Sequence, residues 1–156
     1  MDKIPTITEQ DYLPMEAFSR KWRFTSPTHG ALSDEFLSRV QPLKNVVAAE
    51  LCRLTDHFLG PYHLNEEEFL SVDYSDCPLE YSSVHIWLGD RIPEHTNTLV
   101  VLWDEKDAIL TDKKIFCQYW EDFCYPASDD ILIFPLTMEW ILYWFHEEQF
   151  QFGRRR

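Results

Sequence analysis

The sequence predicts an α+β fold, with N-terminal helices packed on a mostly antiparallel sheet that ends in a C-terminal hairpin. Three observations predict it. Apolar residues of the first third recur at helical spacing, those after residue 69 mostly alternate with polar ones, and residues 140–152 form two apolar arms around a short polar turn. Helices followed by strands, rather than a regular alternation of the two, are typical of this class.

One domain accounts for the whole length. The 156 residues are 45% hydrophobic, which is enough to bury a core without disulfides or a structural metal. The chain shows no internal repeat, low-complexity tract or Gly/Ser-rich linker. We therefore expect a single globular domain over residues 1–153, followed by a basic, solvent-facing tail at 154–156.

The first third is predicted to be helical. A short helix is expected at 14–22, and a second should begin after Ser33, a capping residue followed by Asp34 and Glu35, and run to about Gln41. The strongest helix is expected from Pro42 to the stop at 60–61. Its apolar stripe consists of Leu43, Val47, Leu51, Leu54 and Phe58.

Strands dominate the remainder. Alternation predicts strands at 70–74 and 84–88, and short apolar runs predict two more at 99–103 and 131–134. A helix should begin at Asp112, whose carboxylate can cap it, and end near Tyr125. The tail should form a hairpin of residues 140–146 and 149–152, and both faces of its first arm are apolar, so that arm is predicted to be central in the sheet.

Charge is distributed unevenly. Residues 54–153 hold 20 acidic residues and four basic ones, within a chain of net charge −13. Such a field repels nucleic acid and anionic lipid and attracts basic partners, although ordinary solubility explains it equally well. No apolar run is long enough to span a membrane, and residues 1–12 do not resemble a secretory leader, so we expect a cytoplasmic location.

Common enzyme signatures are absent from the sequence. The glycines stand too far apart for a phosphate-binding loop, there is no G-x-S-x-G, and His146-Glu147-Glu148 lacks the second histidine of H-E-x-x-H. Residues 104–112 lack the glycine and closing glutamate of a calcium loop and are expected to be a solvated connection. The acids at 66–68 are explained as the first turn of a helix capped by Asn65. We expect no metal and no cofactor.

The remaining polar groups show no ligand spacing. The four cysteines form no C-x-x-C pair and are expected to be reduced core thiols, and the six histidines are expected to be ordinary surface or hydrogen-bonded residues. Adjacent Asp129 and Asp130 should point to opposite faces, one exposed and one capping a turn, rather than form an acid and base pair. Trp87 should face away from its apolar neighbours, either as a partner contact or as core of a second face.

Three passages together resemble a small bacterial family of uncharacterised proteins of about this length. They are residues 18–25 (FSRKWRFT), residues 120–130 (WEDFCYPASDD), and His146-Glu147-Glu148 with Phe150, Phe152 and Gly153. The resemblance implies a bacterial, cytoplasmic, single-domain protein and no known activity. In composition the chain is also similar to acidic bacterial immunity proteins, which neutralise basic toxins.

These observations favour a non-enzymatic domain that binds a basic protein partner, for example as an immunity-type inhibitor. An acidic face would steer and cap a basic cleft, with aromatic side chains as anchors. The alternatives are an enzyme or small-ligand protein whose site forms only in three dimensions, and a structural protein that self-associates through strand 140–145. The candidate partner-binding residues are Trp87, Asp104, Glu105, Asp107, Asp129, Asp130, Glu147 and Glu148.

Overall fold

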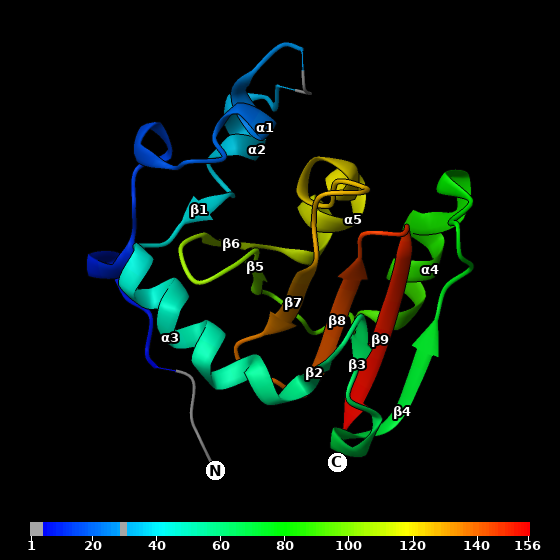
Figure 1. The fold of residues 1–156 in the computed structure, drawn as a ribbon. Coiled ribbons are helices and arrows are strands. Elements are labelled where there is room, and N and C mark those ends of the chain that lie inside the picture. Colours follow the sequence, from blue (N-terminus) through cyan, green and yellow to red (C-terminus); the bar gives the residue numbers. More distant parts are fainter. Residues whose placement is uncertain (1–4, 29–30) are drawn as a thin grey trace.

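A seven-stranded antiparallel sheet forms the centre of the molecule (Figure 1). The computed structural model describes residues 5–28 and 31–156. Within them the strand order is β1-β6-β5-β7-β8-β9-β4, and a separate hairpin pairs β2 with β3. The strands are β1 Gln41–Pro42, β2 Leu59–Gly60, β3 His63–Leu64, β4 Phe69–Tyr74, β5 Leu99–Leu102, β6 Ala108–Thr111, β7 Ile131–Pro135, β8 Trp140–Phe145 and β9 Gln149–Arg155.

Helices cover both faces of this sheet. The α-helices are α1 Trp22–Thr25, α2 Asp34–Leu37, α3 Asn45–Thr55, α4 Val84–Arg91 and α5 Lys113–Phe123. Short 3₁₀ turns are η1 Glu9–Asp11, η2 Met15–Ala17, η3 Asp56–Phe58, η4 Glu66–Glu68 and η5 Tyr81–Ser83. The chain is therefore α+β, as predicted, and ends in the predicted β8–β9 hairpin.

Alternation along the strands produces two cores. Val101, Ile133 and Leu142 project to one face and pack with α1, α4 and α5, whereas Val100 and Leu132 project to the other and pack with α3. Because side chains on both faces are buried, the central strands have no polar face, which is why they are continuous apolar runs in the sequence.

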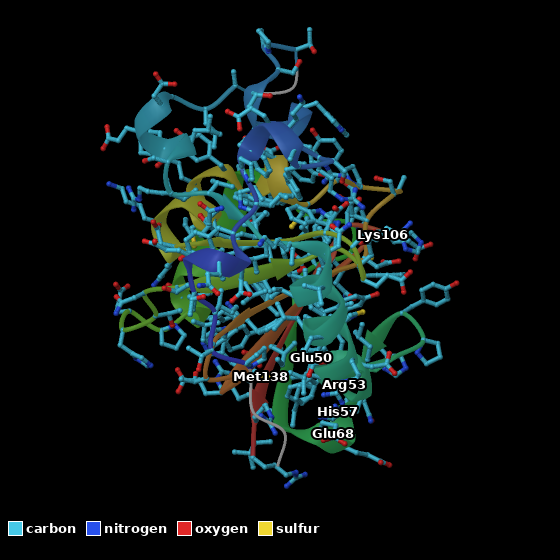
Figure 2. All side chains as sticks on the ribbon, turned by 90° about the vertical axis from the view of Figure 1, so that its left-hand side faces the viewer. Glu50, Arg53, His57, Glu68, Lys106 and Met138 are labelled. Carbon is cyan, nitrogen blue, oxygen red and sulfur yellow. The ribbon has the colours of Figure 1, made fainter. Side chains whose placement is uncertain are left out.

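The predicted amphipathic helices are confirmed where their apolar stripes are long. The whole predicted stripe of α3 is buried, while Glu50 and Arg53 form a 2.7 Å ion pair on its exposed side (Figure 2). At the start of α5, Asp112 Oδ1 accepts a hydrogen bond from the Ile115 amide at 2.9 Å, as expected of a cap. Ser33 caps α2 in the same way through the Phe36 amide.

The chain from 84 to 88 is helical, and the predicted strand there is wrong. Val84 and Leu88 are one helical turn apart and both buried, whereas Ile86, between them, is 57% exposed. Five residues are too few to distinguish a period of two from a period of 3.6. A strand was also missed: β6, at the end of the expected solvated connection, pairs with β1 and β5 and is buried along its length.

Four elements differ from the prediction in their boundaries or type. The helix expected at 14–22 is a 3₁₀ turn followed by the separate α1, and α2 ends at Leu37, before Gln41, which begins β1. Pro42 pairs with Ile109 in β1, so α3 begins three residues later, at Asn45. The acids at 66–68 form a 3₁₀ turn, and the Asn65 side chain makes no cap hydrogen bond there.

The expected basic tail belongs largely to the sheet. Arg154 and Arg155 are the last residues of β9 and pair with β4. Arg154 Nη1 lies 3.0 Å from Asp73 Oδ2, and the Arg155 guanidinium lies 4.8 Å from the centre of the Phe58 ring. The compact domain therefore extends at least to residue 155.

Candidate functional site: the acidic edge of the sheet

The antiparallel topology brings most of the predicted acidic residues to one end of the sheet. Register pairs Leu102 with Leu132, Ile131 with Trp144 and Phe145 with Gln149. The β5–β6 turn, the start of β7 and the β8–β9 turn therefore lie at the same end. We call the exposed carboxylates gathered there the acidic edge, which consists of Asp56, Asp104, Glu105, Asp130 and Glu147.

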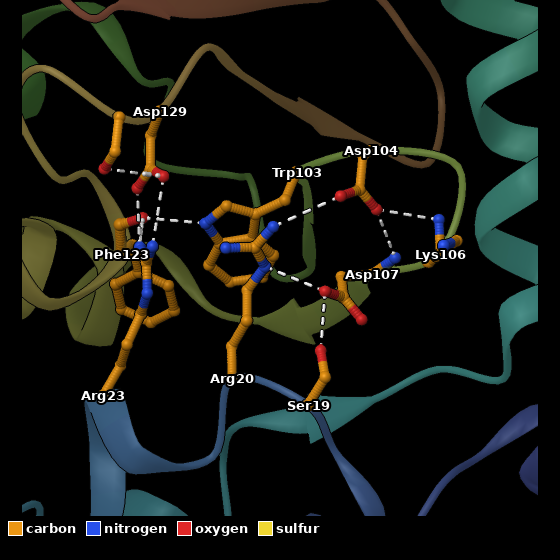
Figure 3. Close-up of polar contacts among 10 residues, drawn as sticks. Ser19, Arg20, Arg23, Trp103, Asp104, Lys106, Asp107, Phe123 and Asp129 are labelled. Carbon is orange, nitrogen blue, oxygen red and sulfur yellow. Dashed lines mark hydrogen bonds and ion pairs between the residues drawn. The ribbon is translucent and has the colours of Figure 1, made fainter.

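Part of this charge is neutralised within the molecule by the segment that leads into α1 (Figure 3). Arg20 Nε donates to Asp107 Oδ2 at 2.9 Å, and Ser19 Oγ donates to the same oxygen at 2.7 Å. Asp107 is buried, so it fixes the N-terminal segment and is not a partner contact. Arg20 also reaches Asp104 at 3.2 Å, but that carboxylate remains 45% exposed and belongs to the edge.

Asp129 is likewise a structural residue. Its two oxygens accept from Arg23 at 2.6 and 3.1 Å, and one of them also accepts from the Tyr125 amide at 2.9 Å. Both side chains of the ion pair are at most 4% exposed. Two N–H bonds from Arg23 to one carboxylate make this a strong buried pair, and the Arg23 guanidinium also lies 3.9 Å from the Tyr125 ring centre. Only Arg23 Nε, which is also buried, has no hydrogen-bond partner within the described residues.

Asp130 points toward solvent, whereas the adjacent Asp129 is buried, as predicted for this pair. It is 43% exposed and accepts hydrogen bonds from the His146 amide at 3.0 Å and the Tyr143 hydroxyl at 3.3 Å. The His146 ring Nδ1 lies 2.9 Å from the same oxygen. Desolvation and then the Asp130 charge raise the pKa of Tyr143, so its hydroxyl stays protonated and donating.

The two glutamates of the β8–β9 turn differ in role. Glu147 is exposed and its carboxylate makes no hydrogen bond or ion pair within the described residues. Glu148 has a positive φ of 68° and its carboxylate accepts from the Tyr81 hydroxyl, so it ties the turn to η5. Desolvation first, and then Glu148, raises the pKa of Tyr81. Of the two, Glu147 is the residue available to a partner.

A small cavity of about 70 Å³ lies at the acidic edge, beside the end of α3, with Asp56, Asp104 and Asp130 in its wall. Ligand pockets are typically several hundred Å³, so it is too small for an ordinary substrate. Cys52 also lines it, and burial, followed by the charges of Asp56 and Glu105, raises the pKa of this thiol. A protonated thiol is a poor nucleophile, so the cavity has no activated nucleophile.

Aromatic residues at the edge differ from those expected. Trp87 lies on α4. Its ring stacks on the Phe150 ring with the centres 6.1 Å apart, and the Arg91 guanidinium lies 4.0 Å from the Trp87 ring centre. Trp87 therefore packs against the core and is not an exposed anchor. Tyr62 is 64% exposed and its ring centre lies 5.7 Å from that of His146. Tyr62 is therefore the aromatic side chain beside the acidic edge.

Other sequence predictions have mixed outcomes. All four cysteines are free, and Cys124 is buried as expected, but Cys77 is exposed and is not a core thiol. Strand 140–145 is paired on both sides and buried, so it cannot form the subunit interface of the structural alternative. His29 lies outside the described residues.

Within residues 5–28 and 31–156, no group of three or more His, Cys, Asp or Glu side chains is arranged to hold a metal ion. The helices of the same residues are too short and too polar for any of them to cross a membrane. No protein-family model matches the chain, and a search of curated proteins finds no relative.

Sequence reasoning missed Asp56, Tyr62 and the two arginines that neutralise part of the edge. Arg20 and Arg23 are 87 and 106 residues from their buried partners. No local pattern reveals such a pairing. The one available signal was the neutral charge balance of the first third beside a strongly acidic remainder.

Proposed function

We propose that this is a non-enzymatic protein of the bacterial cytoplasm that binds a basic protein through the acidic edge, as an immunity-type inhibitor does. One observation carries the proposal. Once Arg20 and Arg23 have taken Asp107 and Asp129, the carboxylates of the acidic edge still face solvent together at one end of the sheet.

Electrostatics supports a protein partner of opposite charge. Two unit charges 4 Å apart attract with about 4 kcal/mol near a protein surface, and the net charge of −13 adds a long-range field. The field acts over about 8 Å at physiological ionic strength, so it chiefly raises the association rate and makes binding sensitive to salt. Tyr62, exposed beside the carboxylates, supplies apolar contact area for the same partner.

The experiment is affinity capture from host lysate at low salt, followed by elution with salt and mass spectrometry. The bait is compared with a Glu105→Lys/Glu147→Lys variant and with a Glu35→Lys/Glu67→Lys control. All four glutamates are exposed, and none of these side chains makes a hydrogen bond or ion pair within the described residues. Both variants change the net charge by the same amount, so they differ only in where the charge is reversed.

We expect the wild type and the control to capture one basic protein that the edge variant loses. With that protein purified, the edge variant should associate at least tenfold more slowly at low salt, and the difference should shrink as salt is added. Equal capture by the edge variant and the control would refute the acidic edge as the binding surface. A folded bait that captures no basic protein would refute the proposed function.

A further inference from the structure

A groove runs between α4 and α5, on the face of the sheet opposite α3. Two cavities of about 460 and 520 Å³ share Lys114 and Cys117 in their walls, so they adjoin each other. The first is lined by charged and polar groups and the second by Tyr81, His85 and Trp120 among others. Their volumes are those of small-molecule sites.

The polar part of the groove gathers basic residues in the most acidic part of the chain. Only four basic residues occur between 54 and 153, and two of them, Lys113 and Lys114, lie here with Arg39. Arg39 is paired with Asp112 at 2.7 Å, and Lys113 with Glu94 at 2.9 Å. Lys114 is exposed and makes no hydrogen bond or ion pair within the described residues, so one positive charge is left over.

The walls of this polar part are held rigidly. Lys113 Nζ donates to the Ile92 carbonyl at 2.7 Å and the Gly89 carbonyl at 3.3 Å, which fixes the first residue of α5 against the end of α4. The Asp112 carboxylate, paired with Arg39, caps the same helix. The positive end of the α5 dipole therefore lies beside Lys114.

Gly89 keeps the groove open. A glycine inside a helix costs about 1 kcal/mol relative to alanine, so it usually has a packing reason. At Gly89 there is none, because an added Cβ would have no atom within 4 Å. The missing side chain leaves empty space in the wall of the cavity.

Thr96 provides a second, independent observation. It lines the same cavity and is 7% exposed, yet its Oγ1 has no hydrogen-bond partner. A buried hydroxyl without a partner costs about 1–3 kcal/mol. A ligand that bears hydrogen-bonding atoms would satisfy this hydroxyl once the Thr96 side chain rotates toward the cavity.

We propose that the groove binds a small aromatic anion, a carboxylate or a phosphate monoester, with its charged group beside Lys114 and Thr96 and its ring toward Tyr81 and Trp120. Tyr81 is 37% exposed and its ring meets the Trp120 ring edge-on at 5.0 Å, while Trp120 is only 5% exposed. The aromatic surface open to a planar body is therefore mainly that of Tyr81. The charged part of this site is separate from the acidic edge, because α5 begins where β6 ends, at the other end of the sheet. The aromatic part extends toward the acidic end, where the Tyr81 hydroxyl donates to Glu148.

The test is titration of ¹⁵N-labelled protein with phenyl phosphate and with benzoate, followed by amide NMR shifts. Inorganic phosphate and benzyl alcohol serve as the isolated anion and the isolated ring. Gly89→Leu should fill part of the groove, since its Cβ would meet nothing within 4 Å, and its control is Asp90→Leu, an exposed neighbour outside the lining. Lys114→Glu reverses the surplus charge, and its control is Lys106→Glu on the exposed β5–β6 turn.

We expect one or both aromatic anions to shift amides of α4 and α5 at millimolar concentration, with weaker binding of each isolated part. Gly89→Leu should abolish the shifts and Lys114→Glu should weaken binding at least tenfold, whereas both controls should bind as the wild type does. Binding of phenyl phosphate alone assigns a phosphate ester, and of benzoate alone a carboxylate. No binding of either anion, or equal binding by Gly89→Leu, would overturn the proposal.

Discussion

The buried pair of Arg23 and Asp129 predicts a large loss of stability when one partner is removed. In Asp129→Ala the guanidinium keeps the Phe123 carbonyl at 3.1 Å but loses both carboxylate contacts, and the Tyr125 amide loses its acceptor. A charge left unpaired in this way typically costs 3–5 kcal/mol. We therefore expect the free energy of unfolding to fall by about 4 kcal/mol, against a typical total of about 5–15 kcal/mol.

Equilibrium unfolding in urea, followed by far-ultraviolet circular dichroism, measures this loss. With a slope near 2 kcal/mol per molar, the midpoint should drop by about 2 M. The double variant Arg23→Met/Asp129→Leu should recover most of the stability, because it removes the unpaired charge along with its partner. A loss below about 1 kcal/mol for Asp129→Ala, or a double variant that loses as much as the two single variants together, would refute the reasoning.

Three further predictions concern packing, pH and thiol chemistry. Gly153→Ala should lower the melting temperature, because the added Cβ would lie 2.6 Å from the buried Phe69 ring, whereas Gly89→Ala, which meets nothing, should raise it. Burial raises the pKa of Asp122 from 3.8 to about 6, so its ionisation as the pH rises lowers the stability of the folded protein. In urea titrations, the stability of Asp122→Asn relative to the wild type should therefore increase from pH 4 to pH 7. No such increase would contradict the prediction. A thiol-reactive dye should label one cysteine quickly in the folded protein, and Cys77→Ser should remove that fast phase.

Elements with a long, consistent pattern could be predicted from the sequence. The α3 stripe extends over sixteen residues, and α5 combines a capping aspartate with an apolar side, so local and tertiary preferences agree. The segment 84–88 is too short for its hydrophobic period to be determined. β6 has only four residues and directly follows a run of acidic residues, so its apolar character was not recognised. Tertiary packing decides both.

The candidate site could be predicted only in part. Turns at one end of an antiparallel sheet lie close together in space. Acidic residues in those turns therefore cluster there even where the exact strand boundaries differ from the prediction. Which acids remain free depends on distant partners. Nothing in the sequence distinguishes Asp107 and Asp129 from the acidic residues next to them. They are buried because Arg20 and Arg23 pack against them in the folded chain. The α4–α5 groove could not be predicted, because its α4 wall is the segment that the alternating pattern indicated to be a strand.

The position of β9 has a consequence for synthesis of the protein. Residues 149–155 are made after β4 and β8, and they form the interior strand between those two. A nascent chain lacking them leaves the apolar β8 with an open hydrogen-bonding edge, and β4 waits without a partner for about eighty residues of translation. The sheet therefore cannot close until β9 has been made, and a stall before residue 149 leaves a ribosome-bound chain with an exposed apolar strand, the kind of intermediate that chaperones bind.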